Sequence, residues 1–207
     1  MKLAAALLLV SVVPAAGQTI KYSTVTCSDP ALGPLQTQQR EFKGKYDEMS
    51  DSVRVVANSE TTSSMVANTH RTLTLGIRFQ GKDLAKSPQW FLENRWEVQS
   101  GDLNVTTKDL TAQSRLQESE ALAILIDDSV RSSLPALAQG RQQNTSLFKG
   151  HTMTEVSTYE VPSDLLVKMF AGKEVKLRVG QHLFKWHPQD FQDAAGIYQT
   201  VVCRAKG

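Results

Sequence analysis

The chain has 207 residues, of which 41% are hydrophobic and 21% charged, and its formal net charge is +2 with the histidines neutral. Such a composition allows a buried core and argues against an intrinsically disordered chain. The near balance of charge provides no long-range attraction for nucleic acid or for an anionic membrane, so we expect neither as a partner.

The first 17 residues have the pattern of a cleavable signal peptide. Lys2 forms a short basic start, residues 3–13 are apolar, and the small residues Ala15 and Gly17 precede the expected cleavage point. Since a membrane-spanning helix needs about 20 apolar residues, this run is too short, and we expect no transmembrane anchor after cleavage. We predict a periplasmic or secreted protein in which residues 18–207 form a single domain. The alternative is that residues 1–17 form a buried strand or helix.

Elements with β character are expected in the first half of the mature chain. Residues 20–27 are rich in β-branched and aromatic types and predict a strand, while 28–39, with two prolines, predict a loop. The region 40–60 is weakly specified and contains a short valine-rich strand, and 59–64 is interpreted as a polar turn. The clearest strand is 71–80, whose period of two predicts one buried face. That face is expected to hold Leu73, Leu75, Ile77 and Phe79.

The middle of the chain adds further strands. We interpret the aromatic-rich segment 90–99 as a strand, and residues 103–106 also have β character. The continuous apolar run 121–126 predicts a buried strand that ends in the turn Asp127-Asp128. Residues 132–144, which contain serine, glutamine and proline, are interpreted as a loop. In segment 90–99 the expected faces are Trp90, Leu92 and Asn94 on one side, and Phe91, Glu93, Arg95, Glu97 and Gln99 on the other.

The last third has the most regular pattern. A strand is predicted over 153–159, a helix over 165–171, a hairpin over 175–186 and a final helix from Pro188. Many short strands with two helices in the C-terminal third indicate a mainly β fold, and we predict an antiparallel β-sandwich. A parallel α/β fold is disfavoured because strands do not alternate with long amphipathic helices.

The C-terminal third also carries a resemblance. The string Tyr159 to Leu166, followed by Val175 to Gly180, Phe184 and the helix after Pro188, is similar to the ends of a family of uncharacterised exported bacterial proteins. The resemblance implies a β-rich fold and export. Its motifs are structural, so it implies no functional residue.

Two cysteines lie near the two ends of the mature chain. In an exported protein an even number of cysteines favours a disulfide, so we predict a bond between Cys27 and Cys203. Such a bond would hold the two terminal segments side by side. Two free thiols are the alternative, and a metal site is disfavoured because no histidine pair lies near either sulfur.

Neither the histidines nor the acidic residues form a recognisable catalytic or metal-binding motif. The closest histidine pair is His182 and His187, but Pro188 prevents a helix that would place both on one face. A zinc site would also need a distant third ligand such as His151. The pair Asp127-Asp128 is better explained as a turn than as a calcium or acid–base site. Because no nucleophile motif or phosphate-binding loop is present either, we assign no catalytic residue, metal or cofactor.

Three tryptophans are candidates for a binding surface. Trp90, Trp96 and Trp186 would stack on sugars or anchor a protein partner if they were exposed, and the alternative is that they are core residues. Asn104 and Asn144 begin glycosylation acceptor patterns, which matter only in a eukaryotic source.

Two functions fit these observations. The first is an extracytoplasmic, non-catalytic binding protein for an unknown protein or carbohydrate partner. The second is a secreted hydrolase, or an inhibitor of one, that acts at the cell wall or on carbohydrate. We favour the first, and we expect a surface without a cluster of titratable groups to support it.

Overall fold

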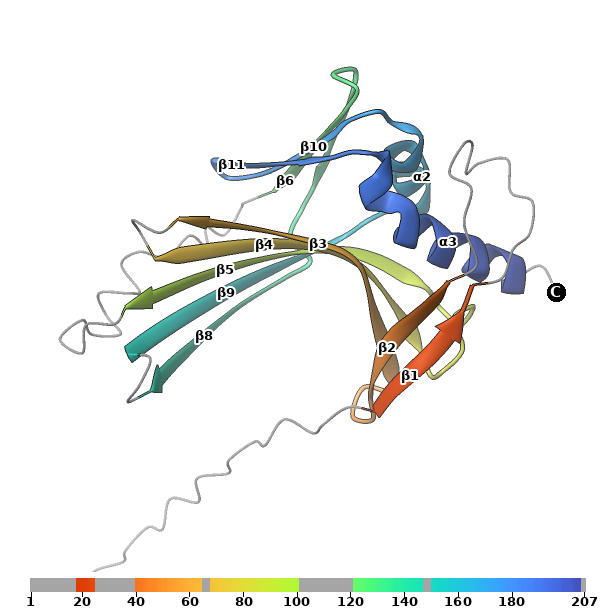
Figure 1. Cartoon of the computed structure of the whole chain (residues 1–207), viewed down its shortest axis with the longest axis horizontal. Coiled ribbons are helices and arrows are strands. Elements are labelled where there is room, and N and C mark those ends of the chain that lie inside the picture. Colours follow the sequence, from red (N-terminus) through yellow and green to blue (C-terminus); the bar gives the residue numbers. More distant parts are fainter. Residues whose placement is uncertain (1–17, 25–39, 65–67, 101–120, 147–149, 206–207) are drawn as a thin grey trace, which may run out of the picture.

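The computed structural model describes residues 18–24, 40–64, 68–100, 121–146 and 150–205. Within them the chain forms two antiparallel sheets, of seven and four strands, with two helices in the C-terminal region (Figure 1). The expectation of a mainly β, antiparallel fold with two helices in the last third is confirmed. The two sheets are unequal in size and open at their edges.

The larger sheet has the strand order β1-β2-β3-β4-β5-β9-β8. Its central strands, β3 to β5, have 12 or 13 residues each and exceed the usual five to six or so. Along the chain its strands are β1 (Gln18–Ser23), β2 (Glu41–Asp47), β3 (Ser52–Ser64), β4 (Thr69–Gln80), β5 (Gln89–Ser100), β8 (Ala138–Ser146) and β9 (Gly150–Glu160).

The smaller sheet has the order β11-β10-β6-β7. Its strands are β6 (Leu122–Ile126), β7 (Val130–Leu134), β10 (Val175–Val179) and β11 (His182–Trp186). Helix α2 (Ser163–Ala171) connects the two sheets, and α3 (Gln192–Ala205) follows the short 3-10 helix η2 (Pro188–Phe191). In Figure 1 the small sheet, α2 and α3 all lie on the same side of the large sheet.

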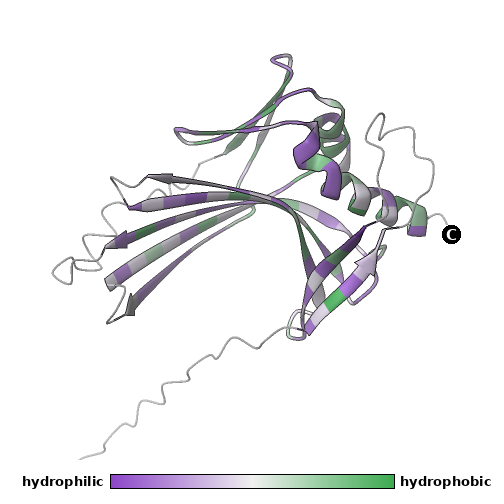
Figure 2. Cartoon of the chain, viewed as in Figure 1, coloured by the Kyte–Doolittle hydropathy of each residue, from purple (hydrophilic) through white to green (hydrophobic). Residues whose placement is uncertain are grey.

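The main core fills the space between the large sheet and this second layer. Side chains at alternate positions of β3, β4 and β5 are buried there, and they pack with apolar residues of the small sheet and of both helices. Figure 2 shows the resulting alternation of hydrophobic and hydrophilic residues along β5 and β9. The opposite face of the large sheet is mostly polar, and no described helix or strand lies over it (Figure 1).

Two segments predicted as turn or loop are strands. Residues 59–64 extend β3, and 132–144 contain the end of β7 and most of β8. The polar part of β3 is stable as a strand because its hydroxyls pair across to β4. Ser59 and Thr74 lie 3.1 Å apart, and Thr61 and Thr72 lie 2.9 Å apart (oxygen to oxygen). The expected strand at 103–106 lies outside the described residues.

Because of Tyr22 on β1, we expect the stability of the fold to depend on pH in the alkaline range. Its ring is 6% exposed and stacks on Phe42, and burial raises the pKa of its hydroxyl above the ordinary value. The folded chain therefore holds this proton more tightly than the unfolded chain does. The contribution to stability is complete below the unfolded-state pKa of about 10 and is lost as pH rises through the higher folded-state value.

We expect Tyr22→Phe to reduce the loss of stability between neutral and strongly alkaline pH. The measurement is urea unfolding of both proteins at a series of pH values, with Tyr46→Phe as a comparison because its pKa is also raised, by Asp51. Identical pH profiles for the native protein and for Tyr22→Phe would contradict this expectation.

Candidate functional site: a polar trough on the open sheet face

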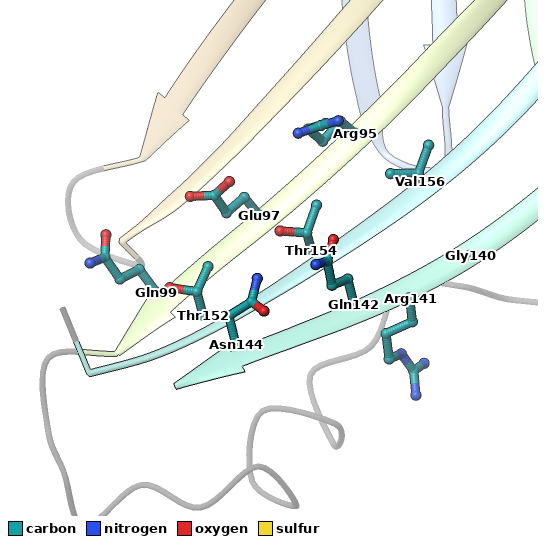
Figure 3. Close-up of a pocket in the computed structure, with 10 residues that line it drawn as sticks. All are labelled: Arg95, Glu97, Gln99, Gly140, Arg141, Gln142, Asn144, Thr152, Thr154 and Val156. Atoms are coloured by element: carbon teal, nitrogen blue, oxygen red, sulfur yellow. The ribbon is translucent and has the colours of Figure 1, made fainter. Parts of the chain in front are cut away.

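A trough of about 590 Å³ lies on the open face of the large sheet, over β5, β9 and β8 (Figure 3). Strand pairing arranges its side chains in three rows, each with one residue from every strand. The rows are Arg95-Val156-Gly140, Glu97-Thr154-Gln142 and Gln99-Thr152-Asn144.

The alternation of strand residues explains why these side chains share one face. On β5 the even-numbered residues Trp96 and Val98 are buried in a small cluster with Met153, so the odd-numbered residues must face the open side. Arg141 of β8 also borders the trough, but in Figure 3 its side chain points away from it. Its Nε donates a hydrogen bond of 2.9 Å to Oε1 of Glu155, which is 2% exposed on the inner face.

The polar side chains of the trough differ in their hydrogen bonding from those on the neighbouring part of the same face. On β3 and β4 the hydroxyls pair across strands, and Ser63 Oγ lies 2.8 Å from His70 Nδ1. In the trough, the side chains of Thr152, Thr154, Gln142 and Asn144 have no hydrogen-bond partner within the described part of the chain. Their donors and acceptors are therefore available to a ligand.

Two charged groups lie in the trough, Arg95 and Glu97. Neither forms an ion pair with another described residue. Glu93, one position further along the same face, is bound by Arg54 at 3.0 Å. The guanidinium of Arg54 also lies 4.7 Å from the ring centre of Phe91, so this pair closes one end of the polar surface. The trough thus presents one cation, one anion and a set of neutral hydrogen-bonding groups.

The trough ends at β8, the last strand at this edge of the described sheet. Strand β8 pairs only with β9 among the described strands, and it has nine residues. Natural edge strands are usually protected by lysine, proline, bulges or shortness. β8 contains neither lysine nor proline, and its one charged side chain, Arg141, is bound to Glu155 on the inner face. No described strand pairs with the outer side of its main chain.

The three candidate tryptophans are core residues. Trp90 is 3% exposed, Trp96 6% and Trp186 1%. Trp90 packs near Tyr198 of α3, and Trp186 packs edge-on against Phe191. The hypothesis of a tryptophan binding surface is corrected by this burial, because a buried ring has no face for a ligand. The alternative interpretation as core residues agrees with the structure.

The titratable candidates are dispersed. His182 begins β11 and His187 follows its last residue, both exposed, and His151 lies at the start of β9 in the other sheet. Asp127 and Asp128 form the β6–β7 turn with positive φ of 48° and 55°. Asp127 Oδ1 accepts hydrogen bonds from the amides of Lys173 and Glu174 at 2.8 and 2.9 Å, so its role is structural. Among the described residues no group of three or more His, Cys, Asp or Glu is placed to hold a metal ion.

The sequence predicted strands over most of β5 and β9, and it missed β8. The odd-numbered residues of segment 90–99 were expected on a common face, and they form one side of the trough. Most residues of β8 were assigned to a loop because segment 132–144 contains serine, glutamine and proline. The alternating positions Gly140, Gln142 and Asn144 only weakly indicated a common face. Their pairing with β9 shows that they share one. Asn104 lies outside the described residues.

Comparison of the chain with protein-family models, with curated proteins and with solved structures finds no match in any of the three. No helix in the described part of the chain is long and apolar enough to cross a membrane.

Proposed function

We propose that the chain is an exported, non-catalytic binding protein, and that it holds an extended segment of a partner polypeptide along β8 and the trough. The observation that carries the proposal is the edge of β8 that no other described strand pairs with, beside polar side chains that have no hydrogen-bond partner in the described part of the chain. In strand addition, main-chain hydrogen bonds provide affinity and neighbouring side chains provide specificity. β8 offers the first of these and the trough offers the second.

The chemistry of the trough favours a polypeptide over a carbohydrate. Threonine hydroxyls and side-chain amides pair equally well with peptide groups and with sugar hydroxyls. Sugar sites, however, usually add an aromatic ring for stacking, and the residues that line the trough include none. Arg95 and Glu97 can in addition pair with side chains of opposite charge on a partner segment. No described feature of the trough specifically favours a hydrolase or an inhibitor.

The proposal is tested with a random 12-residue peptide library displayed on phage. Selected peptides are synthesised, and their binding is measured by fluorescence anisotropy. Thr154→Lys places a long cation in the middle of the trough, and we expect it to weaken binding by about tenfold or more. Thr61→Lys is the matched control, because Thr61 lies on the same face but pairs with Thr72 of β4. It should leave binding within about twofold.

Hydrogen exchange distinguishes strand addition from other modes. We expect outward-facing amides of β8 to exchange rapidly in the protein alone, and selected peptides to protect amides within Ala138–Ser146. Equal weakening by both variants, or protection confined to another part of the chain, would overturn the proposal. Binding of glycans on an array, lost in Thr154→Lys while no peptide is selected, would replace the polypeptide with a carbohydrate.

Export and the disulfide belong to the same proposal. Residues 1–17 and Cys27 lie outside the described residues. Cys203 lies on α3. Two contacts support a bond between the terminal segments. Arg40 pairs with Asp193 of α3 at 2.5 Å, and Arg204 lies close enough to Tyr22 to act on its pKa.

We therefore expect the exported protein to begin at Gln18 and to carry no free thiol. Intact mass before and after reduction, with a thiol label, measures both properties. Labelling of two thiols without reductant would contradict the disulfide, and a retained N-terminal segment would contradict cleavage at this position. Cys203→Ser should behave like the reduced protein in urea unfolding.

A further inference from the structure

The exposed face of the small sheet has a pattern that the proposed function does not use. β6 is apolar on both faces, in contrast to the alternating β10. Leu122, Ile124 and Ile126 enter the core, while Ala123 and Leu125 point to the other side and are half-buried. A strand that is apolar on both faces is typical of a sheet covered on both sides.

These residues form the floor of a hollow of about 590 Å³. Leu183 of β11, which is 49% exposed, adds an apolar side chain on the far side of β10, with Arg178 between it and Ala123. The register places Leu183, Arg178, Ala123 and Ser133 in one row, and Lys185, Lys176, Leu125 and Arg131 in the next. The apolar floor on β6 therefore has cations on both sides.

Most cations of this face form no ion pair with another described residue. Lys176 is held by Asp128 at 2.6 Å and by Glu174 at 3.1 Å. Arg131, Arg178 and Lys185 are exposed, and none forms an ion pair with another described residue. These three cations lie around the apolar floor. They can therefore pair with acidic groups of a partner that carries such groups on both sides of an apolar stripe.

The spacing of the cations fits a helix. Arg131 on β7 and Lys185 on β11 lie three strand spacings apart, which is about 14 Å. An α-helix with its side chains is about 10–12 Å wide, so one helix over β6 and β10 would have Arg131 on one flank and Lys185 on the other, with Arg178 beneath it. Helix on sheet is also the ordinary way to cover such a face, as α2 and α3 do on the inner side of the molecule.

We propose that this face binds an amphipathic helix of a partner protein, with leucine-type residues on Ala123, Leu125 and Leu183 and acidic residues toward Arg131, Arg178 and Lys185. The surface is separate from the trough, so the two proposals fail or succeed independently. Because the cations are exposed, binding should weaken with added salt.

The probe is a fluorescein-labelled helical peptide of about 18 residues, long enough for five turns, with a leucine stripe flanked on both sides by glutamate. Its affinity for the full mature protein is measured by anisotropy at several salt concentrations. The double variant Arg131→Glu with Arg178→Glu is expected to weaken binding by about tenfold or more. Leu183→Ser tests the apolar contact separately and should cost about tenfold.

The matched control is Lys43→Glu with Lys45→Glu. It changes the net charge by the same amount on β2, where both lysines are exposed, and it should leave the affinity within about twofold. Circular dichroism checks that each variant is folded, and Leu183→Ser provides a test that leaves the charge unchanged. A peptide with lysine in place of glutamate should not bind.

Three results would overturn this proposal. One is equal binding of the glutamate and lysine peptides, and another is unchanged affinity in Arg131→Glu with Arg178→Glu. The third is binding to vesicles of phosphatidylcholine with about 30% phosphatidylglycerol in the absence of peptide binding, which would make the face a lipid-binding surface.

Discussion

Replacing Gly76 with alanine is expected to lower the free energy of unfolding by about 3 kcal/mol, at the upper end of the usual cost of overpacking. Gly76 lies on the open face of β4, directly opposite Phe91 of β5. A Cβ at this position would lie 2.5 Å from Cζ of Phe91 and 2.6 Å from the carbonyl oxygen of Val55. Both distances are too short for atoms that are not bonded.

The surroundings of Gly76 cannot easily relax. The Phe91 ring is 6% exposed although it faces the open side, because it lies across the glycine and is covered by Arg54. Arg54 is in turn held by Glu93 at 3.0 Å. The other close atom belongs to the main chain of β3, next to the register shift between Val56 and Asn58. A new methyl group would therefore have to move either a fixed ring or a strand.

Gly140→Ala is the matched control, because it makes the same substitution on the same face of the same sheet. A Cβ at Gly140 meets no atom within 4 Å. Since glycine weakens a strand interior, this variant should be unchanged or more stable by about 0.5 kcal/mol. Urea unfolding followed by circular dichroism compares the two. A loss of less than about 1 kcal/mol for Gly76→Ala would show that the ring and strand do relax.

The strands that the sequence predicts well are those whose pattern reports burial directly. In 71–80 the four alternating apolar residues of β4 all face the main core, and each is no more than 1% exposed. The helix at 165–171 and the hairpin at 175–186 follow the same logic. The polar end of β3 and all of β8 could not be predicted in this way. Their stability comes from pairing with β4 and β9, which are distant partners that a local pattern does not contain.

In the candidate site, too, some features follow from the local sequence pattern and others depend on pairing between distant strands. Arg95 and Glu97 were expected to share a face because they lie two residues apart on one strand. Their association with Thr154 and Gln142 depends on the register of β5 with β9 and of β9 with β8. Composition was also misleading for the tryptophans, because the residue type is equally suited to a core and to a binding surface. Only the position of each ring relative to the second layer decides between the two.

For Trp186, an experiment can distinguish a core role from a role in ligand binding. It belongs to β11, and its Nε1 donates a hydrogen bond of 2.7 Å to Oε2 of Glu60 on β3, so it links the two sheets. We expect Trp186→Phe to lower the free energy of unfolding by about 2 kcal/mol, because an aromatic ring still packs against Phe191 but the bond to a carboxylate is lost. Trp186→Ala should cost about 4 kcal/mol, because it also leaves a cavity.

A double-mutant cycle isolates the hydrogen bond from the packing. If Trp186 and Glu60 stabilise the fold through each other, Trp186→Phe and Glu60→Ala together should cost less than the sum of the single changes, with a coupling of about 2 kcal/mol. Trp90→Phe with Glu60→Ala is the control pair, because Trp90 packs near Tyr198 and has no bond to Glu60 among the contacts of the described residues. If Trp186 instead served a ligand, Trp186→Phe would change binding of a selected peptide while leaving the unfolding free energy unaltered. Because a ring that is 1% exposed cannot meet a ligand without opening the two sheets, we expect the stability to change and the peptide affinity to stay within about twofold.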